Sequence, residues 1–290
     1  MLQSYAYGLG QSRIGVQQRP RYGLIEIDGR KAGVLQILEA GALKNTLHAV
    51  ILDRGPLWLD GFGEKRHWEA FLSAFSREFP ARLGRKRRFI PEIDANSFIL
   101  DLLHAYGWRQ KSGSGYQTLW LDLTQSEDVL RKDLKKNWRN VLTKAEKSGL
   151  ELVFDDTGRD LPWLLQHYTA DRAAKGYDGP SVSLLKAMAA HALPRKEMLT
   201  AMACLRGKPV AGVLIFCHGG SATYQIGFTD DQGRSTGAHH MLLWHAVLAL
   251  KARGIKDFDL GGLNDDTAKG VAAFKHGMGG DLLALPGIFG

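Results

Sequence analysis

The tetrapeptide Ala-Gly-Val-Leu occurs twice in this chain, at residues 32–35 and again at residues 211–214. Each copy lies in the second of two apolar, β-rich runs that flank a short glycine-containing turn. The turns are Asp28-Gly29 in the first half and Arg206-Gly207-Lys208 in the second half. Such a pattern predicts a β-hairpin, so each half is expected to contain the same pair of antiparallel strands.

The agreement between the halves continues downstream of the hairpins. Amphipathic helical patterns surround Trp68 and Trp244, at nearly the same spacing as the two tetrapeptides. A basic stretch and a short strand follow each helix, RFIPEID in one half and IKDFDL in the other. An ordered set of matches at nearly constant spacing indicates internal duplication, so we expect two domains built on one plan.

The segment between the halves places the predicted domain boundary. The run YQTLWLDLT is expected to be a strand that closes the first domain. The following segment, 126–149, has a Ser126 N-cap, an apolar face and a terminal Gly149, and it is predicted to be one long helix. We therefore predict domains at 1–123 and 124–290, with about the last ten residues able to pack back on the first domain. Further helices are expected at 160–175 and 181–192.

Composition narrows the class of protein. The chain has 290 residues, 44% of them hydrophobic and 23% charged, which is typical of a folded protein with a sizeable core. No apolar run is long enough for a membrane helix, and no signal-peptide pattern is evident, so a cytoplasmic location is expected. Cys204 and Cys217 lie in strand-like segments and are interpreted as reduced core residues. No cysteine or histidine spacing indicates a metal site. The net charge of +8 suits a phosphate-rich partner without selecting one.

A polar loop precedes the predicted helix around Trp244 and suggests phosphate binding. Residues 234–238, Arg-Ser-Thr-Gly-Ala, partly match the Q/R-x-x-G-x-G/A pattern of acetyltransferases, and they lie in the strand–loop–helix–strand order of that fold. Free N–H groups at a helix N-terminus attract phosphate, so Arg234 and Gly237 are candidate donor-binding residues. The last position of the pattern is His239 instead of Gly or Ala, which disfavours coenzyme A there. An ordinary helix N-terminus explains the loop equally well.

The run DFDLGGLNDDTAKGVAAFKHGMGG resembles the C-terminal signature of the FemABX family of peptidoglycan aminoacyltransferases. Weaker similarities include LTKAEKSGLELVF, YTADRAAKG, ATYQIGFT and ILDRGPLWLD, so the resemblance extends over essentially the whole chain. It implies an α/β (α+β mixed) fold with two tandem GNAT-like acyltransferase domains. The inserted helical hairpin of some members is missing, so no coiled-coil arm is expected.

The resemblance implies roles for several residues. Lys275 is expected to contact the donor, either by stabilising the oxyanion of acyl transfer or by holding the terminal phosphate of a tRNA acceptor end; a solvated lysine is the alternative. Phe274 is expected to pack beside it, with a carbonyl that could orient the amine. Arg172 matches a family position that binds pyrophosphate, although a surface ion pair with Asp171 explains it equally well. Tyr224 is expected to bind substrate or to be a core residue.

Three further candidates end strands or turns. Arg54 and Asp60 flank the GPLWL segment, which the family pattern places at the acceptor site, while Gly55-Pro56 alone would explain a turn there. Asp259 ends a strand beside two glycines, where sheets of this class place ligands, or it caps that turn.

Two basic features are candidates for RNA contact. One is the stretch Arg82 to Arg88, and the other is the polar face of the predicted helix 126–149. The alternative for both is an ordinary solvated charged surface.

The sequence therefore predicts an acyltransferase that forms an amide bond, with aminoacyl-tRNA as donor and an amine of a UDP- or lipid-linked muropeptide as acceptor. No tightly bound cofactor is expected, DNA is not an expected partner, and peripheral contact with the inner membrane surface remains open. One alternative is an acyl-CoA-dependent N-acyltransferase or natural-product amide ligase acting on a small-molecule or polysaccharide precursor. Another is a non-catalytic RNA- or nucleotide-binding module of the same fold.

Overall fold

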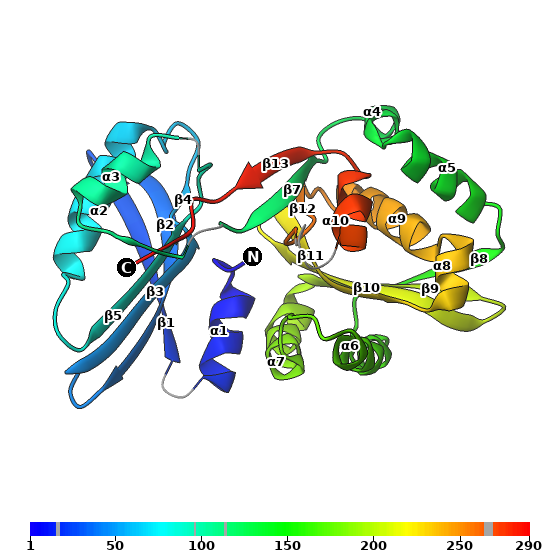
Figure 1. Ribbon diagram of the computed structural model, residues 1–290, viewed down its shortest axis with the longest axis horizontal. Helices are drawn as coiled ribbons and strands as arrows, with labels where there is room; N and C mark the ends of the chain where they lie inside the picture. Colours follow the sequence, from blue (N-terminus) through cyan, green and yellow to red (C-terminus); the bar gives the residue numbers. More distant parts are fainter. Residues whose placement is uncertain (16–17, 96, 113–114, 264–268) are drawn as a thin grey trace. The chain divides into compact units, whose positions relative to one another are not determined.

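The computed structural model describes residues 1–15, 18–95, 97–112, 115–263 and 269–290, and its chain divides into two compact units. The N-terminal unit contains Leu2–Gln117 together with Leu283–Gly290. The C-terminal unit contains Thr118–Leu282 together with Met1. Figure 1 shows the elements of both units.

The N-terminal unit is built on one mixed sheet with the strand order β1-β2-β3-β5-β14-β6, and β4 pairs with β2. Neighbours are antiparallel except β3 and β5, which run parallel. In chain order the elements are α1 (Tyr5–Ile14), β1 (Gln18–Ile27), β2 (Arg30–Ala42), β3 (Leu47–Gly55), β4 (Leu57–Trp58), α2 (Lys65–Glu78), β5 (Arg85–Pro91), α3 (Ile99–Ala105), β6 (Gln110–Ser112) and, after the C-terminal unit, β14 (Ile288–Phe289).

Helices cover both faces of this sheet (Figure 1). The α2 and α3 side holds a core rich in aromatic rings, including Trp68, Phe75, Phe89, Trp108 and Phe289. Burial of such large side chains supplies most of the stabilisation that a domain of this size needs. On the opposite side of the sheet, α1 carries Tyr5, whose ring stacks on Tyr22 of β1.

The C-terminal unit has a second mixed sheet, ordered β13-β7-β12-β11-β10-β9-β8. The α4, α5, α9 and α10 helices lie on one face, and α6 and α7 lie on the other (Figure 1). In chain order the elements are β7 (Gln117–Asp122), α4 (Glu127–Asp133), α5 (Lys136–Ala145), β8 (Leu150–Asp155), α6 (Leu161–Lys175), α7 (Val182–Ala192), β9 (Met198–Leu205), β10 (Lys208–His218), β11 (Ser221–Thr229), α8 (Asp231–Thr236), α9 (Ala238–Ala252), β12 (Asp257–Asp259), α10 (Lys269–His276) and β13 (Asp281–Ala284). The predicted helices at 160–175 and 181–192 correspond to α6 and α7.

The predicted duplication is present in the structure. Each unit has an antiparallel three-strand meander, a helix and then a strand parallel to the third strand of the meander: β1-β2-β3-α2-β5 and β9-β10-β11-α9-β12. Both hairpin turns have two residues with positive φ, Asp28 and Gly29 in one and Arg206 and Gly207 in the other. Turns of this kind match the twist of the strands that they join. The prediction of an α/β fold with mixed sheets is therefore confirmed.

Two local predictions are wrong. The expected single helix over 126–149 is two helices, because Leu134 takes an extended ψ of 132° and the Lys135 N–H donates to Gly277 O at 2.9 Å. The polar loop expected over DDQGRSTGAHH, residues 230–240, contains the short helix α8, which Asp230 caps by accepting a hydrogen bond from Gly233 N. In both places a contact distant from the helical pattern, or an unrecognised cap, decides the backbone path.

The strand β7, which the sequence analysis assigned to the first domain, pairs with β12 in the sheet of the C-terminal unit. None of the helices within the described ranges is both long and apolar enough to cross a bilayer. The longest helices there, α6 and α9, have 15 residues each, and no coiled-coil arm is found in this part of the chain. Cys204 and Cys217 are free thiols.

Candidate active site at the ends of β11 and β12

The candidate site of the C-terminal unit lies where two parallel strands part. β12 pairs with β11 over three residue pairs, the last being Thr223 with Asp259. β12 ends at this pair, and the chain then turns at Gly261, whose φ is +72°, while β11 continues to Thr229 along its other neighbour, β10. The carboxyl ends of parallel strands are where sheets of this class place ligands. The residues around this point are therefore the candidates for chemistry.

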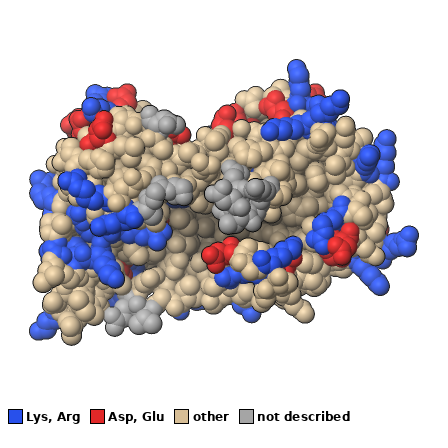
Figure 2. All heavy atoms as spheres, in the orientation of Figure 1, with Lys and Arg blue, Asp and Glu red and all other residues tan. Residues whose placement is uncertain are grey.

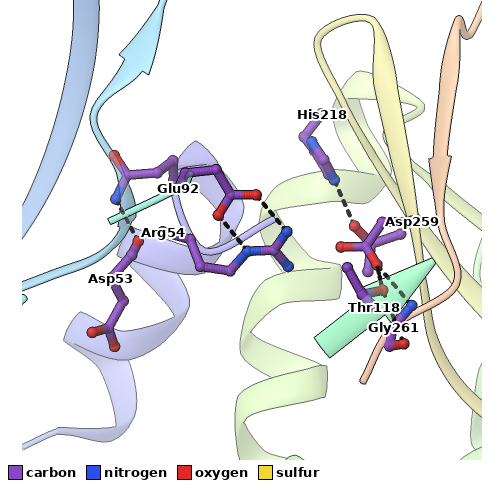
Figure 3. A network of polar contacts seen from close by, with 9 residues as sticks. Asp53, Arg54, Glu92, Thr118, His218, Asp259 and Gly261 are labelled. Atoms are coloured by element: carbon purple, nitrogen blue, oxygen red, sulfur yellow. Dashed lines mark hydrogen bonds and ion pairs between the residues drawn. The ribbon is translucent and has the colours of Figure 1, made fainter. Parts of the chain in front are cut away.

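Asp259 holds the turn after β12 in place. Its carboxylate is fully buried and accepts hydrogen bonds from Thr118 Oγ1 at 2.5 Å and from Gly261 N at 2.8 Å. Thr118 lies on β7, and its hydroxyl is also 3.0 Å from Gly261 O. Figure 3 shows Thr118 and Asp259 converging on this turn. A buried carboxylate must be hydrogen-bonded to be tolerated, so this arrangement fixes the backbone at the strand end.

Lys275 is a buried cation beside this turn. Its side chain extends from α10, its residue is 6% exposed, and Nζ donates to Gly262 O at 2.7 Å. The ammonium also lies 5.6 Å from the centroid of the Tyr224 ring. Burial lowers the pKa of Lys275 to about 8, against the opposing attraction of the Asp259 charge. Lys275 is therefore mostly protonated at neutral pH, yet it can exchange its proton close to neutrality.

Tyr224 and His239 form a hydrogen-bonded pair next to Lys275. The Tyr224 hydroxyl lies 3.0 Å from His239 Nε2. Burial raises the pKa of Tyr224 above its usual range, while burial and then the charges of His240 and Lys275 lower the pKa of His239 to about 4. Both groups are neutral, so one proton is shared in this contact: the hydroxyl donates to Nε2 when the histidine proton sits on Nδ1, and Nε2 donates to the hydroxyl oxygen in the other tautomer. Among the described residues, Nδ1 is buried without a hydrogen-bond partner.

Phe274 connects this pair to helix α5. Its ring packs against His239, His240 and Trp138, with centroid separations of 5.2, 4.8 and 5.8 Å. The Phe274 carbonyl accepts a hydrogen bond from Gly277 N at 3.1 Å. A side chain at Gly277 would meet Trp138 Cδ1 at 2.5 Å, so glycine at this position leaves room for the indole ring. The FKHGMGG ending is thus the surface on which α5 packs.

The structure brings four of the residues predicted from the sequence together: Lys275, Phe274, Tyr224 and Asp259. Arg172 lies on α6, where its Nε donates to Tyr177 O at 3.3 Å.

The two residues predicted to bind phosphate lie at the junction of α8 and α9. The guanidinium of Arg234 donates to Thr229 O at 2.6 Å and also pairs with Asp231. Gly237 has a φ of +72° and lies against Val141 of α5. This arrangement is that of a helix junction closed by internal hydrogen bonds.

Arg54 and Asp60 belong to the N-terminal unit. Arg54 forms a two-pronged ion pair with Glu92, with both N–O separations at 2.6 Å (Figure 3). Its guanidinium also lies 5.1 Å from the Tyr116 ring centroid. Asp60 is exposed in the turn after β4. Arg54 is only 7% exposed, so its guanidinium charge must be compensated, and the carboxylate of Glu92 compensates it.

Sequence reasoning missed Thr118 and Trp138, and it treated His239 only as a departure from a motif. Thr118 precedes Asp259 by 141 residues, and no local sequence pattern predicts that contact. The apolar spacing of segment 126–149 includes Trp138, but the packing of Trp138 on Phe274 depends on the helix break at Leu134. A His at the first turn of a buried helix was the one available signal for the tyrosine partner.

The chain matches one family model and is similar to several solved structures. The family model described as acetyltransferase (GNAT) domain matches residues 130–276. The crystal structure of FemX is 15% identical, with 100% of this chain and 91% of that chain covered and a TM-score of 0.81. The C-terminal domain of a putative lysylphosphatidylglycerol synthetase from Agrobacterium fabrum is 16% identical, with 100% and 88% covered and a TM-score of 0.59.

A tandem GNAT protein from the clavulanic acid biosynthesis pathway is 13% identical, with 98% and 86% covered and a TM-score of 0.52. No curated protein sequence matches the chain. The structural likenesses confirm that the two units form a tandem GNAT fold.

Proposed function

Because the chain belongs to the acetyltransferase (GNAT) domain family and is an acyltransferase, we propose that it transfers an aminoacyl group from aminoacyl-tRNA to an amine of a peptidoglycan precursor. The observation that carries this proposal is the buried ammonium of Lys275 beside the parted ends of β11 and β12. A fixed cation at this place can stabilise the negative oxygen that forms when an amine attacks an ester carbonyl.

The likeness to FemX supports the choice of donor and acceptor. It extends over the whole of this chain, and the DxGG and FK-x-G-x-G pieces that resemble the FemABX signature supply Asp259 and Lys275 of the candidate site. A second neighbour is described as a putative lysylphosphatidylglycerol synthetase, a name that joins an amino acid to a lipid headgroup. The resemblance to the FemABX signature and the name of the second neighbour support an aminoacyl group over a simple acetyl group.

The proposed reaction needs no covalent enzyme intermediate. The acceptor amine forms the new C–N bond, the ester C–O bond to the tRNA ribose breaks, and the proton lost by the amine ends on the ribose oxygen. Lys275 stabilises the oxyanion, and the Tyr224–His239 pair holds the phenol hydroxyl in a fixed direction beside it. A carboxylate of the substrate could accept the proton from the amine nitrogen and pass it to the ribose oxygen.

Arg172, Arg54, Asp60, Arg234 and Gly237 remain candidates for substrate binding under this proposal. Arg172 lies in the C-terminal unit, where its guanidinium donates to Tyr177 O at 3.3 Å and contacts the Tyr168 hydroxyl. Its fork of five N–H donors could also bind a pyrophosphate. Its place on the helical layer opposite α9 and α10 would then mark an acceptor-binding surface.

The test is transfer of label between defined substrates. The protein is incubated with a pool of radiolabelled aminoacyl-tRNAs and, in separate reactions, with a UDP-linked or a lipid-linked muropeptide. Label in either muropeptide supports the proposal and names the acceptor class. The absence of transfer from every tRNA pool would refute it.

Acyl-CoA is the second candidate donor, favoured by the family model itself and by the clavulanic acid pathway neighbour, whose description mentions AcCoA. Release of thiol from acetyl-CoA in the presence of a small-molecule amine or a polysaccharide precursor would select this reading. Binding of RNA or nucleotide without turnover of either donor would select a non-catalytic module.

A further inference from the structure

The outer surface of the helices α4 and α5 carries a group of exposed lysines, called here the α4–α5 lysine surface. It consists of Lys132, Lys135, Lys136, Lys144 and Lys147. Figure 2 shows Lys and Arg side chains gathered over these helices, at the upper right of the view. Within the described ranges of the chain, none of these five ammonium groups forms an ion pair with a carboxylate. They are therefore available to an external anion.

The acidic residues near this surface do not cancel the positive charge of its lysines. Glu146 is engaged by Arg131, with an N–O distance of 2.7 Å, so its charge is already compensated. Glu127, Asp128 and Asp133 all lie on α4, which leaves α5 with cations on its outer face. Lys136, Asn140 and Lys144 recur at intervals of four residues and form a row that spans about 12 Å along the helix.

The inner face of α5 touches the candidate site. Trp138 packs against Phe274, the residue before Lys275, and Lys135 N donates to Gly277 O at 2.9 Å. One helix thus presents lysines outward and contacts the FKHGMGG segment inward. A long anion lying on the outer face would pass within one helix diameter of the site, which is about 10 Å.

The other basic stretch, Arg82 to Arg88, differs in how its charges are used. The Arg82 guanidinium donates to three backbone carbonyls, and Arg85 donates to His48 Nδ1 and Pro80 O. Arg88 pairs with Asp53 at 2.8 Å. These side chains tie strands and turns of the N-terminal unit together, so they have fewer donors left for a partner.

The chemistry of the α5 face favours RNA over a lipid bilayer. Its exposed residues besides the lysines are Asn137, Asn140 and Thr143, which are hydrogen-bonding side chains. A helix that docks on a membrane presents apolar residues between its cations, and the outward face of α5, every residue of which is described, has none. Amide, hydroxyl and ammonium groups together suit phosphates and ribose hydroxyls.

We propose that the α4–α5 lysine surface binds the phosphate backbone of the tRNA whose acceptor end enters the site beside Lys275. This inference rests on the proposed function, since it places the donor of that reaction. It assigns Lys136, Lys144 and Lys147 to non-sequence-specific contact with phosphates.

The test measures binding of deacylated total tRNA over a range of salt concentrations, and so it does not depend on transfer. A triple variant, Lys136→Glu with Lys144→Glu and Lys147→Glu, is compared with wild type. The control triple variant, Lys31→Glu with Lys186→Glu and Lys208→Glu, makes the same charge change at exposed lysines elsewhere. Circular dichroism and thermal melting check that each variant is folded.

We expect the surface variant to bind tRNA roughly tenfold or more weakly, with a slope of log affinity against log salt that is smaller by about three. The control variant should keep a slope close to that of wild type. An equal loss in both variants, or no loss in the surface variant, would overturn the proposal. So would binding of the lysines to phosphatidylglycerol vesicles with no binding to tRNA.

The outcomes separate this inference from the proposed function. Transfer activity with unchanged tRNA binding in the surface variant would leave the function standing and remove the surface. Loss of tRNA binding in that variant, with no aminoacyl transfer by wild type, would keep the surface and remove the function.

Discussion

At the scale of single residues, the candidate site depends on two buried charges that would be costly alone. Asp259 is stabilised by Thr118 and by the Gly261 N–H, and Lys275 by Gly262 O and the Tyr224 ring. The two charged groups sit on either side of the same glycine turn, so each also lowers the cost of burying the other. A group held this way does not need to reorganise when charge develops on a substrate.

Replacement of Lys275 tests its chemical role. Lys275→Met keeps the length and apolar stem of the side chain but removes the ammonium, so kcat should fall about 10²- to 10³-fold, as for loss of an oxyanion partner. In wild type, kcat should fall as pH rises through about 8, because the pKa of Lys275 is lowered to about 8. Steady-state kinetics at several pH values measures both effects. An unchanged rate in Lys275→Met would remove the assignment.

The same pKa predicts a change of stability with pH. Folding lowers the pKa of Lys275 from 10.5 to about 8, so between these values the unfolded chain binds more protons than the folded one. The free energy of unfolding should therefore rise with pH across this window, by up to roughly 3 kcal/mol. Urea denaturation at pH 8 and pH 10 should show this rise in wild type, and Lys275→Met should lack it.

Removal of the Thr118 hydroxyl tests the support of Asp259. Thr118→Val leaves the shape of this fully buried side chain but deprives the carboxylate of its 2.5 Å hydrogen bond. The free energy of unfolding should fall by about 1–3 kcal/mol, as measured by urea denaturation with an unchanged m-value. Thr143→Val is the control, because that exposed hydroxyl bonds only the backbone one turn back. Equal small effects in both variants would contradict the structural role of Thr118.

At the scale of elements, the junction between α5 and α10 joins the fold to the site. The chain breaks its helix at Leu134, gives the Lys135 N–H to Gly277 O, and restarts so that Trp138 faces Phe274. A side chain at Gly279 would approach Asp133 O at 3.1 Å on the other side of the break. The glycines of the FKHGMGG segment are thus explained by close packing as well as by chemistry.

Two glycine substitutions test this junction, one at Gly277, directly after α10, and one at Gly270, within α10. Gly277→Ala would place a methyl group 2.5 Å from Trp138 Cδ1 and should cost about 1–3 kcal/mol, the usual penalty for overpacking. Gly270→Ala, within α10, meets none of the described atoms within 4 Å and should stabilise the protein by about 0.5–1 kcal/mol, since alanine favours helix. Thermal melting of both variants measures these changes in stability. A Gly277→Ala protein as stable as wild type would contradict the predicted overpacking and show that Trp138 can move away.

The elements differ in how far the sequence could predict them. The hairpins, the meander order and the helices around Trp68 and Trp244 follow from local turn chemistry and periodicity, and they are present as predicted. The single helix over 126–149 was wrong because its apolar face continues through Leu134, and only the partner at Gly277 reveals the break. Lys275 and Asp259 could be predicted because they belong to one local motif. Thr118 could not, because it lies 141 residues before Asp259 and meets it only in the folded chain.

At the scale of the whole molecule, residues from both ends of the chain complete one sheet. Residues 2–117 supply most of the N-terminal unit, yet β14 at residues 288–289 lies between β5 and β6 of its sheet. Phe289 is fully buried in the aromatic core, and residue 290 exchanges two backbone hydrogen bonds with Arg109. The folding of this unit therefore depends on residues translated after the other unit.

Truncation of one side chain tests this dependence. Phe289→Ala should destabilise the N-terminal unit by about 3–5 kcal/mol, the cost of removing a buried phenylalanine. Hydrogen exchange should quicken in peptides from 2–117 more than in peptides from 118–282. Leu282→Ala, at a position 52% exposed, is the control and should change little. Equal protection of β5 and β6 in Phe289→Ala and wild type would contradict the expected role of β14.

The position of β14 has a consequence for synthesis on the ribosome. When residues 2–117 emerge, one edge of β5 has no strand beside it, and at about 5–20 residues per second the missing strand follows roughly ten to thirty seconds later. An open, flat edge invites pairing with other nascent chains. β5 begins with the run Arg85-Lys86-Arg87-Arg88. Four adjacent positive charges on an exposed strand repel the same strand of a second chain. This basic run can therefore oppose aggregation until β14 has been synthesised and pairs with β5.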